Sequence, residues 1–154
     1  AREANICGIL GIALSMEFCG ATVFHYEDCA TIAIDFIEEV LERTQGREEE
    51  FSHVVFNVNF PNVPREDNQG WKFARQGLSI VKDDLVEIES GTDETGAERK
   101  VFSIRAEYFV NSTDINVGSA AVSHRYTAVT TLPLLSDQLP PNEEIAQWPI
   151  FARQ

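Results

Sequence analysis

The pattern of apolar and polar positions along the chain predicts a mixed α/β fold built on a strand–helix–strand unit. The run Ile9–Met16 is apolar at nearly every position, which is typical of a parallel strand covered on both faces. The segment Tyr26–Thr44 has apolar residues at helical spacing and acidic residues opposite them, so it predicts an amphipathic helix that ends before Gly46. The run His53–Pro61 predicts a second strand. A crossover unit of this length makes the two strands parallel, with a right-handed connection.

Two asparagines interrupt the strand predicted at His53–Pro61. Asn57 and Asn59 are two residues apart, so their side chains point to the same face of the strand. A buried amide without a hydrogen-bond partner costs a few kcal/mol by order of magnitude. We therefore expect both amides to bond to neighbouring loops. Pro61 cannot donate to a ladder, so pairing should stop there.

The segments around this unit predict short elements and connections. We expect the tail of a helix at Ala1–Gly8, a loop at Glu17–Phe24 and a charged turn at Arg47–Glu50. The proline-containing stretch Asn62–Gly70 indicates an irregular loop, and Trp71–Gly77 a short strand.

The second half of the chain begins with a predicted antiparallel hairpin. Apolar and charged residues alternate in Leu78–Ser90 and again in Arg99–Val110, and Gly91–Gly96 between them has the composition of a turn. The sides of this hairpin should be amphipathic. We expect residues 1–154 to form a single domain with a hairpin arm at 77–110 and a docking tail at 133–154.

A short helix and a last strand follow the hairpin. The helix should run from Thr113-Asp114 to Val122, with Thr113 or Ser112 as its N-cap. The β-branched and aromatic run Tyr126–Leu132 predicts the strand. The tail beyond Pro133 holds large apolar residues, which usually pack on their own domain or on a neighbour.

Composition narrows the class of partner. The 154 residues include 25 acids and 12 bases, for a net charge of −13, which opposes binding to nucleic acid and to anionic lipid surfaces. Three cysteines, Cys7, Cys19 and Cys29, do not make a disulfide framework, and they favour a reducing, intracellular compartment. Neither a signal peptide nor an apolar run long enough to insert into a membrane is evident. Cytoplasm and an organelle lumen are not distinguished.

Several residue groups could carry chemistry, but each has a stronger structural interpretation. The acidic pair Asp83-Asp84 lies on the predicted hairpin arm, with no His or Asn nearby to complete a metal site. His25, Cys29 and Cys19 offer three soft ligands without a fourth, so buried thiols are the better interpretation. No nucleophile-elbow motif surrounds Ser123-His124, and Gly8–Gly11 lacks the length and the Lys of a phosphate-binding loop.

The segment Phe56–Pro61 is similar to the Leu-Asn-Val-Asn-Val-Pro signature of the SurE family of metal-dependent 5′-nucleotidases and phosphatases, which makes Asn57, Asn59 and Pro61 landmarks. It is one of five short blocks that resemble this family and follow in the same order. Ala4–Ser15 resembles its Glu-Gly-Ala and Gly-Ile-Pro-Ser-Ile-Ala-Val-Ser segment, with Leu10-Gly11 in place of Pro-Ser.

The other three blocks lie further along the chain. Trp71–Gly77 resembles a Gly-x-x-x-Thr-Arg-Gln-Gly strand and supplies the landmarks Arg75 and Gln76, with Ala74 for Thr. Thr113-Asp114 resembles the family's Thr-Asp. Tyr126–Leu132 resembles Gly-Tyr-Val-Ser-Val-Thr-Pro-Leu and supplies Tyr126 and Thr130. The departures from the family pattern there include Arg125 for Gly, Ala128 for Ser and Thr131 for Pro.

The resemblance implies scaffold without catalytic residues. The family's metal and catalytic groups belong to an Asn-Asp-Asp-Gly turn, a following serine, and an asparagine before a His-Ser-Gly-Thr segment, and no residue of this sequence matches them. The resemblance therefore implies no catalytic or metal residue on this chain. A divalent metal, Mg or Mn, is expected only if the missing half is supplied. The projecting hairpin and the C-terminal segment are what family members use to associate as dimers or tetramers.

Three hypotheses about function follow. The first is a non-catalytic structural or interaction subunit of a larger assembly. The second is the C-terminal half of a split or truncated metal-dependent phosphomonoesterase that hydrolyses nucleoside monophosphates. The third is a small-ligand binding module at the strand ends. The first two imply a protein partner, either a homo-oligomer or a complementing chain.

Overall fold

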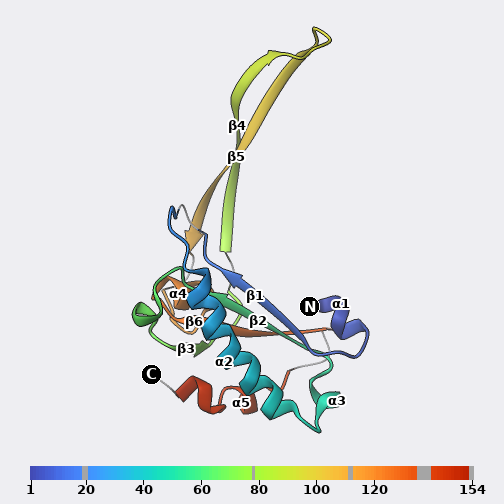
Figure 1. The fold of residues 1–154 in the computed structure, drawn as a ribbon, viewed down its shortest axis with the longest axis vertical. Helices are drawn as coiled ribbons and strands as arrows, with labels where there is room; N and C mark the ends of the chain where they lie inside the picture. Colours follow the sequence, from blue (N-terminus) through green and yellow to red (C-terminus); the bar gives the residue numbers. More distant parts are fainter. Residues whose placement is uncertain (19–20, 78, 111–112, 135–139, 153–154) are drawn as a thin grey trace. The chain divides into compact units, whose positions relative to one another are not determined.

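The computed structural model describes residues 1–18, 21–77, 79–110, 113–134 and 140–152. Contacts divide the chain into two compact units, one formed by residues 1–77 and 112–154 and the other by residues 78–111. Both are drawn as ribbons in Figure 1.

The first unit is built on a four-stranded mixed sheet in the order β1-β2-β6-β3. Strands β1 (Gly11–Met16) and β2 (Val54–Phe60) are parallel, as the sequence predicts. Strand β6 (Thr127–Pro133) is antiparallel to β2 and parallel to β3 (Trp71–Phe73). The mixed α/β class with a parallel pair is therefore confirmed.

Helices lie on both faces of this sheet. The longest is α2 (Tyr26–Thr44), which has the predicted bounds and is followed by Gly46 at a positive φ of 73°. The short helices are α1 (Arg2–Ile6), α3 (Glu48–Phe51), α4 (Gly118–Ser123) and α5 (Asn142–Ile145), with 3-10 turns η1 (Arg65–Asp67) and η2 (Pro149–Ala152). No helix in the described part of the chain is long and apolar enough to cross a membrane.

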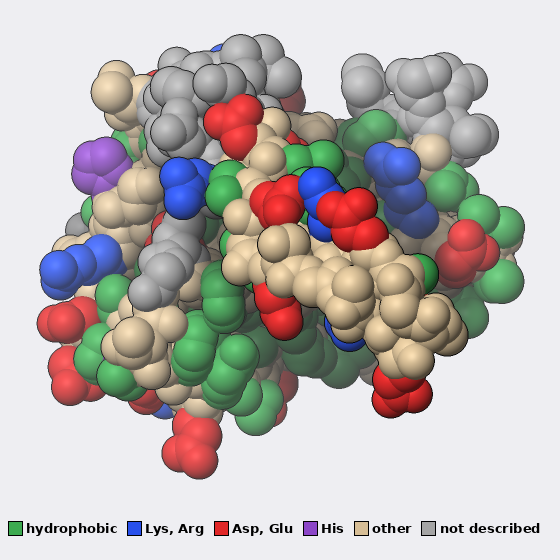
Figure 2. All heavy atoms as spheres, turned by 90° about the horizontal axis from the view of Figure 1, so that it is seen from above, with side chains coloured by type: hydrophobic (Ala, Val, Ile, Leu, Met, Phe, Trp, Pro, Cys, Tyr) green, Lys and Arg blue, Asp and Glu red, His purple; other side chains and the backbone are tan. Residues whose placement is uncertain are grey.

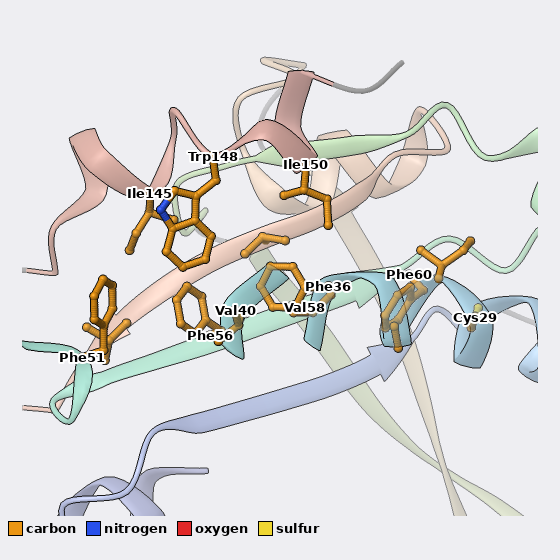
Figure 3. Packing of buried hydrophobic residues seen from close by; sticks show 14 residues of the cluster. Cys29, Phe36, Val40, Phe51, Phe56, Val58, Phe60, Ile145, Trp148 and Ile150 are labelled. Atoms are coloured by element: carbon orange, nitrogen blue, oxygen red, sulfur yellow. The ribbon is translucent and has the colours of Figure 1, made fainter. Parts of the chain in front are cut away.

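The main core lies on the sheet face covered by α2 and the tail. Phe36 of α2 meets Phe56 of β2 edge to face, with ring centroids 5.6 Å apart, and stacks on Trp71 of β3 at 5.3 Å. Figure 3 shows Ile145, Trp148 and Ile150 of the tail pointing toward the same residues. All three are buried, so the tail docks on its own domain.

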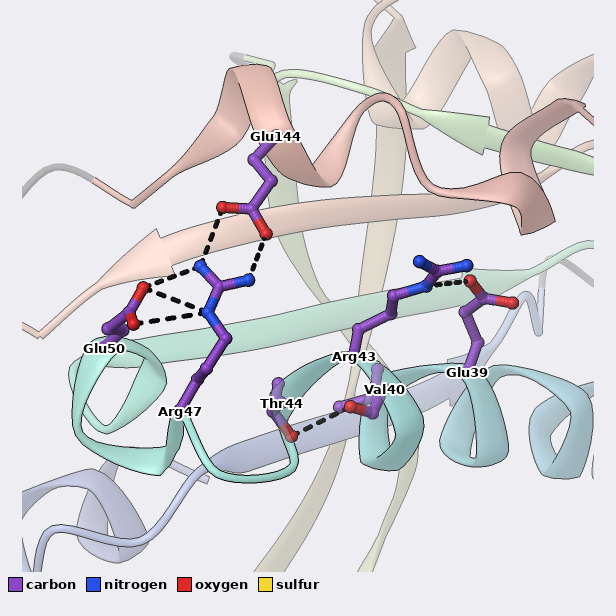
Figure 4. Close-up of polar contacts among 7 residues, drawn as sticks. All are labelled: Glu39, Val40, Arg43, Thr44, Arg47, Glu50 and Glu144. Atoms are coloured by element: carbon purple, nitrogen blue, oxygen red, sulfur yellow. Dashed lines mark hydrogen bonds and ion pairs between the residues drawn. The ribbon is translucent and has the colours of Figure 1, made fainter.

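An ion cluster ties α3 to α5 at the edge of this core. The Arg47 guanidinium donates to both carboxylate oxygens of Glu144, at 2.6 and 2.9 Å, and also to Glu50 (Figure 4). It also lies 5.2 Å from the centre of the Phe51 ring. The hydrogen bonds from Arg47 hold the pKa of Glu144 below its usual range.

The opposite face of the sheet is covered by α4. Ala121 and Val122 of this helix pack on Ala128 of β6. Arg125, at φ 66°, ends the helix in a Schellman arrangement: its N–H donates to Val122 O, and the N–H of Tyr126 donates to Ala121 O. The left-handed conformation explains why the family pattern has glycine where Arg125 stands.

The second unit is an antiparallel hairpin of β4 (Ser79–Thr92) and β5 (Glu98–Val110). A bulge between Glu87 and Glu89 shifts the register. Apolar side chains on its described part are exposed, namely Leu85, Ile88, Phe102 and Ile104. The predicted hairpin is present, with strands slightly longer than expected.

Three local predictions are wrong. The charged turn at Arg47–Glu50 is a helix, α3, because Phe51 anchors it in the core. Strand β3 stops at Phe73, since the chain then leaves β6 and the N–H of Arg75 donates to Asn116 O instead. The helix expected from Thr113 starts only at Gly118, with Val117 as its N-cap. The alternative cap, Ser112, lies outside the described residues.

The prediction that β1 is covered on both faces is also wrong. Strand β1 is at one edge of the sheet, and its burial alternates weakly, with Leu14 and Ser15 exposed on opposite faces. Its apolar composition is that of an interior strand, but no described strand lies on its outer side.

Candidate functional site

Two of the landmark residues, far apart in sequence, meet in an ion pair. Arg75 Nη2 lies 2.8 Å from a carboxylate oxygen of Asp114. The backbone N–H and side-chain amide of Asn116 donate to the other oxygen, at 3.0 and 2.9 Å. The hydrogen bond from the Asn116 N–H, followed by the one from Arg75, holds the pKa of Asp114 below its usual range. Asp114 therefore fixes a turn and an arginine instead of starting a helix.

A polar pocket of about 320 Å³ opens beside this ion pair. Its lining brings together Arg75, Gln76 and Thr130 from the landmark set. Asn116, Thr131 and Asn142 add amide and hydroxyl groups, and Asn142 bonds to the Thr131 hydroxyl. The residues described as lining the pocket offer hydrogen-bond donors and acceptors, and they include no Asp, Glu, His or Cys that could act as a general acid or base.

The two asparagines of β2 lie on the face away from the main core. In the ladder, Asn57 pairs with Thr130, and Asn59 with Ala128. Both side chains are half-buried, and neither makes a hydrogen bond within the described part of the chain. The expectation that they bond to neighbouring loops is wrong, because partial exposure to water satisfies these amides instead.

The carboxyl ends of the parallel strands are closed by a loop contact. Asn62, just after the buried Pro61, accepts from the N–H of His25 at 3.0 Å and donates to Val23 O at 2.9 Å. The His25 ring faces Asp28 at 3.4 Å. Cys29 is buried 3.9 Å from Pro61 O, and burial, followed by the Asp28 charge, raises the pKa of its thiol. The burial of Cys29 agrees with the preferred interpretation of a buried thiol, and Cys19 lies outside the described residues.

The remaining candidate residues are placed where they serve the fold and do not form a reactive site. Asp83 and Asp84 are neighbours in strand β4, so their side chains point to opposite faces of the hairpin and cannot share one ion. The Ser123 hydroxyl donates to Ser119 O, and His124 Nδ1 lies 2.8 Å from Ala120 O. Both therefore bond to the backbone of α4. Tyr126 packs beside Ala121 at the end of that helix, and Thr113 precedes the Asp114 turn.

The divalent metal that the resemblance associates with the missing half has no site among the residues described here. Among them, no three His, Cys, Asp or Glu side chains are grouped so that they could hold a metal ion. No catalytic step can be derived through a metal at these residues.

Sequence and structure comparisons agree on the ancestry of this arrangement. The family model described as survival protein SurE matches residues 1–83, more than half of the chain. The chain belongs to the SurE family. The 5′-nucleotidase SurE of Aquifex aeolicus is 31% identical over 134 residues, which are 87% of this chain and 49% of that protein. The 5′-nucleotidase SurE of Desulfatibacillum aliphaticivorans is 35% identical over 83 residues, 54% of this chain and 30% of that protein.

A solved SurE structure shows the same fold. The crystal structure of the SurE protein from Aquifex aeolicus has a TM-score of 0.63 and 27% identity, and the match covers 95% of this chain and 54% of that one. This SurE chain thus spans about half the length, or less, of the relatives it matches.

Sequence reasoning missed the asparagines that organise these sites. Asn62 and Asn116 hold loops through paired backbone and side-chain contacts, and Asn142 lines the polar pocket. Asn116 follows Asp114 by two residues, a spacing typical of Asx turns, which could have indicated its role. Nothing local marks Asn62 or Asn142.

Proposed function

We propose that this chain is the scaffold portion of a SurE-type phosphohydrolase, inactive by itself and completed by a portion that carries the metal ligands. The completed assembly would hydrolyse nucleoside monophosphates with Mg or Mn. The observation that carries the proposal is the match of nearly the whole chain to about half of a SurE structure. The similar proteins of Desulfatibacillum aliphaticivorans and Aquifex aeolicus are each named 5′-nucleotidase SurE.

The contacts of the described residues are consistent with a scaffold role. Arg75 and Asp114 neutralise each other, and Cys29, Ser123 and His124 contact protein groups. The chain would then contribute the sheet, helix α2 and the hairpin arm. Exposed apolar residues on the arm, such as Leu85 and Ile104, suit association with another subunit. We place this assembly in a reducing, intracellular compartment on the basis of the cysteines.

The test is hydrolysis of nucleoside monophosphates with Mg²⁺ or Mn²⁺. The purified 154-residue chain should release no phosphate above a metal-only blank. The same chain, co-expressed and purified with the part of the Aquifex aeolicus protein outside the match, should release phosphate, and EDTA should abolish that activity. Metal-dependent hydrolysis by the chain alone would overturn the proposal.

A purely structural subunit is the second candidate, favoured by the exposed apolar residues of the arm. It predicts that the co-expressed portion binds but that no phosphate is released. A catalytically competent relative, assayed in parallel as the intact Aquifex aeolicus protein, excludes a failure of the assay itself.

A further inference from the structure

Three aromatic rings form an exposed stack in the segment that joins β1 to α2. The Phe24 ring stacks on Phe18, with centroids 5.4 Å and planes 15° apart, and on Tyr26, at 5.5 Å and 20°. Phe18 and Tyr26 are 70% and 62% exposed. Because Phe24 contacts both of the other rings, the exposed ring surface of this aromatic stack belongs to Phe18 and Tyr26.

Hydrogen bonds from the end of β2 hold the segment that carries the aromatic stack. The side chain of Asn62 accepts from the N–H of His25 at 3.0 Å and donates to Val23 O at 2.9 Å, on either side of Phe24. A segment anchored in this way loses less conformational entropy when a ligand binds. The stack is therefore suited to receive a ligand without rearrangement.

The aromatic stack lies at the carboxyl end of two parallel strands. The N–H of Glu17 donates to Phe60 O at 2.9 Å, which continues the pairing of β1 with β2, and Phe18 is the next residue. In open α/β sheets, ligands bind outside the carboxyl ends of the strands. The position of the stack is therefore that of a ligand-binding surface.

The charges beside the rings select the kind of ligand. Glu17 and Glu27 are the sequence neighbours of Phe18 and Tyr26. Figure 2 shows hydrophobic side chains at the surface of the molecule among Asp and Glu side chains. Carboxylates repel an anion such as a phosphate group, but they accept hydrogen bonds from ring N–H and amino groups. A flat, uncharged ring with such groups at its edge fits these surroundings.

We propose that the exposed rings of Phe18 and Tyr26 bind the base of a nucleoside monophosphate by stacking. The inference rests on the proposed function and adds the residues of this chain that recognise the substrate. Every base has a flat face that stacks on an aromatic side chain, and preferences among bases follow stacking strength. Purine nucleotides should therefore be preferred over pyrimidine nucleotides. The phosphate is left to the portion that carries the metal ligands.

A second copy of this chain is the less suitable occupant of the aromatic stack. Two copies that met through these rings would bring Glu17 and Glu27 of one copy beside the same acids of the other, in a chain of net charge −13. A neutral base adds no such repulsion.

The first test measures binding of adenosine to the purified 154-residue chain, so it does not depend on the missing portion. Saturation-transfer NMR should show transfer from the chain to the adenine protons, and a titration gives the Kd. The double variant Phe18→Ala, Tyr26→Ala should weaken binding by about tenfold or more. The pair Phe18→Tyr, Tyr26→Phe keeps both rings and should bind adenosine within about twofold of the wild type.

Phe102→Ala is the matched control for the loss of an exposed ring. Phe102 is 51% exposed on the hairpin arm, so its removal should leave the Kd within about twofold. Ribose and inorganic phosphate, which lack the base, should show no binding that depends on Phe18 and Tyr26. Circular dichroism checks that each variant is folded.

The second test uses the chain co-expressed with the unmatched portion of the Aquifex aeolicus protein. The double alanine variant of Phe18 and Tyr26 should raise the KM for adenosine monophosphate by about fivefold or more, with kcat little changed. The KM for ribose 5-phosphate, which has no base to stack, should stay within about twofold.

Several results would overturn the inference. They are no binding of adenosine at up to about 10 mM, binding that the double alanine variant leaves unchanged, and an equal rise of KM for both phosphate esters. An oligomer of the chain that the double variant dissociates would do the same. If adenosine binds through these rings but the completed assembly releases no phosphate, the stacking site stands and the proposed function fails. If the assembly hydrolyses adenosine monophosphate with a KM that the double variant does not change, the proposed function stands and the stacking site fails.

Discussion

Trp148 is the side chain whose removal should most directly measure how the tail stabilises the domain. It is 3% exposed and its ring lies 5.7 Å from Phe56 and 6.1 Å from Phe51. Truncation of a buried Trp to Ala costs about 3–5 kcal/mol through lost burial and the cavity left behind. We therefore expect Trp148→Ala to lower the free energy of unfolding by that amount.

The indole nitrogen makes a finer prediction possible. Trp148 Nε1 is buried without a hydrogen-bond partner among the described residues. Removing an unpaired buried donor recovers roughly 1–3 kcal/mol. The smaller ring of Phe gives up about 1–2 kcal/mol of burial and packing. Trp148→Phe should therefore leave the free energy of unfolding within about 1 kcal/mol of the wild type, because the two effects oppose each other.

Urea unfolding followed by far-ultraviolet circular dichroism measures both changes without relying on the indole as a probe. The slope of free energy against urea should stay constant across the variants. Leu85→Ala, with a side chain 73% exposed, is the control and should change stability by less than about 0.5 kcal/mol. If Trp148→Ala cost less than about 1 kcal/mol, the docking of the tail described here would be refuted.

Three further predictions concern charge, thiol reactivity and backbone conformation. Hydrogen bonds from Arg47 lower the pKa of Glu144 in the folded state. Their stabilising effect is therefore present above the unfolded pKa of about 4.3 and is lost as the pH falls through the folded pKa. The melting temperature of Arg47→Met should accordingly fall less between neutral and acidic pH than that of the wild type. Burial raises the pKa of the Cys29 thiol, whereas Cys7 is exposed, so iodoacetamide at mildly alkaline pH should label Cys7 before Cys29. Peptide mass analysis measures the two rates, and equal rates would contradict the burial of Cys29. Arg125→Gly should raise the free energy of unfolding by about 1 kcal/mol, because glycine adopts the left-handed conformation of this position without strain. Arg125→Ala keeps the Cβ atom and should give no such gain.

The sequence predicts those parts of the fold that local periodicity determines. Helix α2 has the predicted bounds because its apolar spacing and the following Gly46 act locally. The parallel pairing of β1 with β2 follows from the length of the connection. The start of α4 could not be predicted, because Asp114 is held by Arg75, a residue distant in sequence.

In the candidate site, too, local sequence predicts single residues but not how they come together. The resemblance identifies Arg75, Gln76 and Thr130 separately, but their convergence at one pocket depends on how β3 and β6 pair. The exposed edge of β1 could not be predicted either, since its composition indicates neighbours on both sides.

The place of the hairpin in the chain has a consequence for folding kinetics. Pairing of β2 with β6 joins Val58 to Val129, two residues separated by the whole of β4 and β5. Closing a loop of that length is entropically costly and slows folding. The hairpin pairs residues that are close in sequence, and its own ladder brings Ser79 next to Val110. Once formed, it shortens the loop that the sheet must close, so the arm should act as an early folding unit for the rest of the domain.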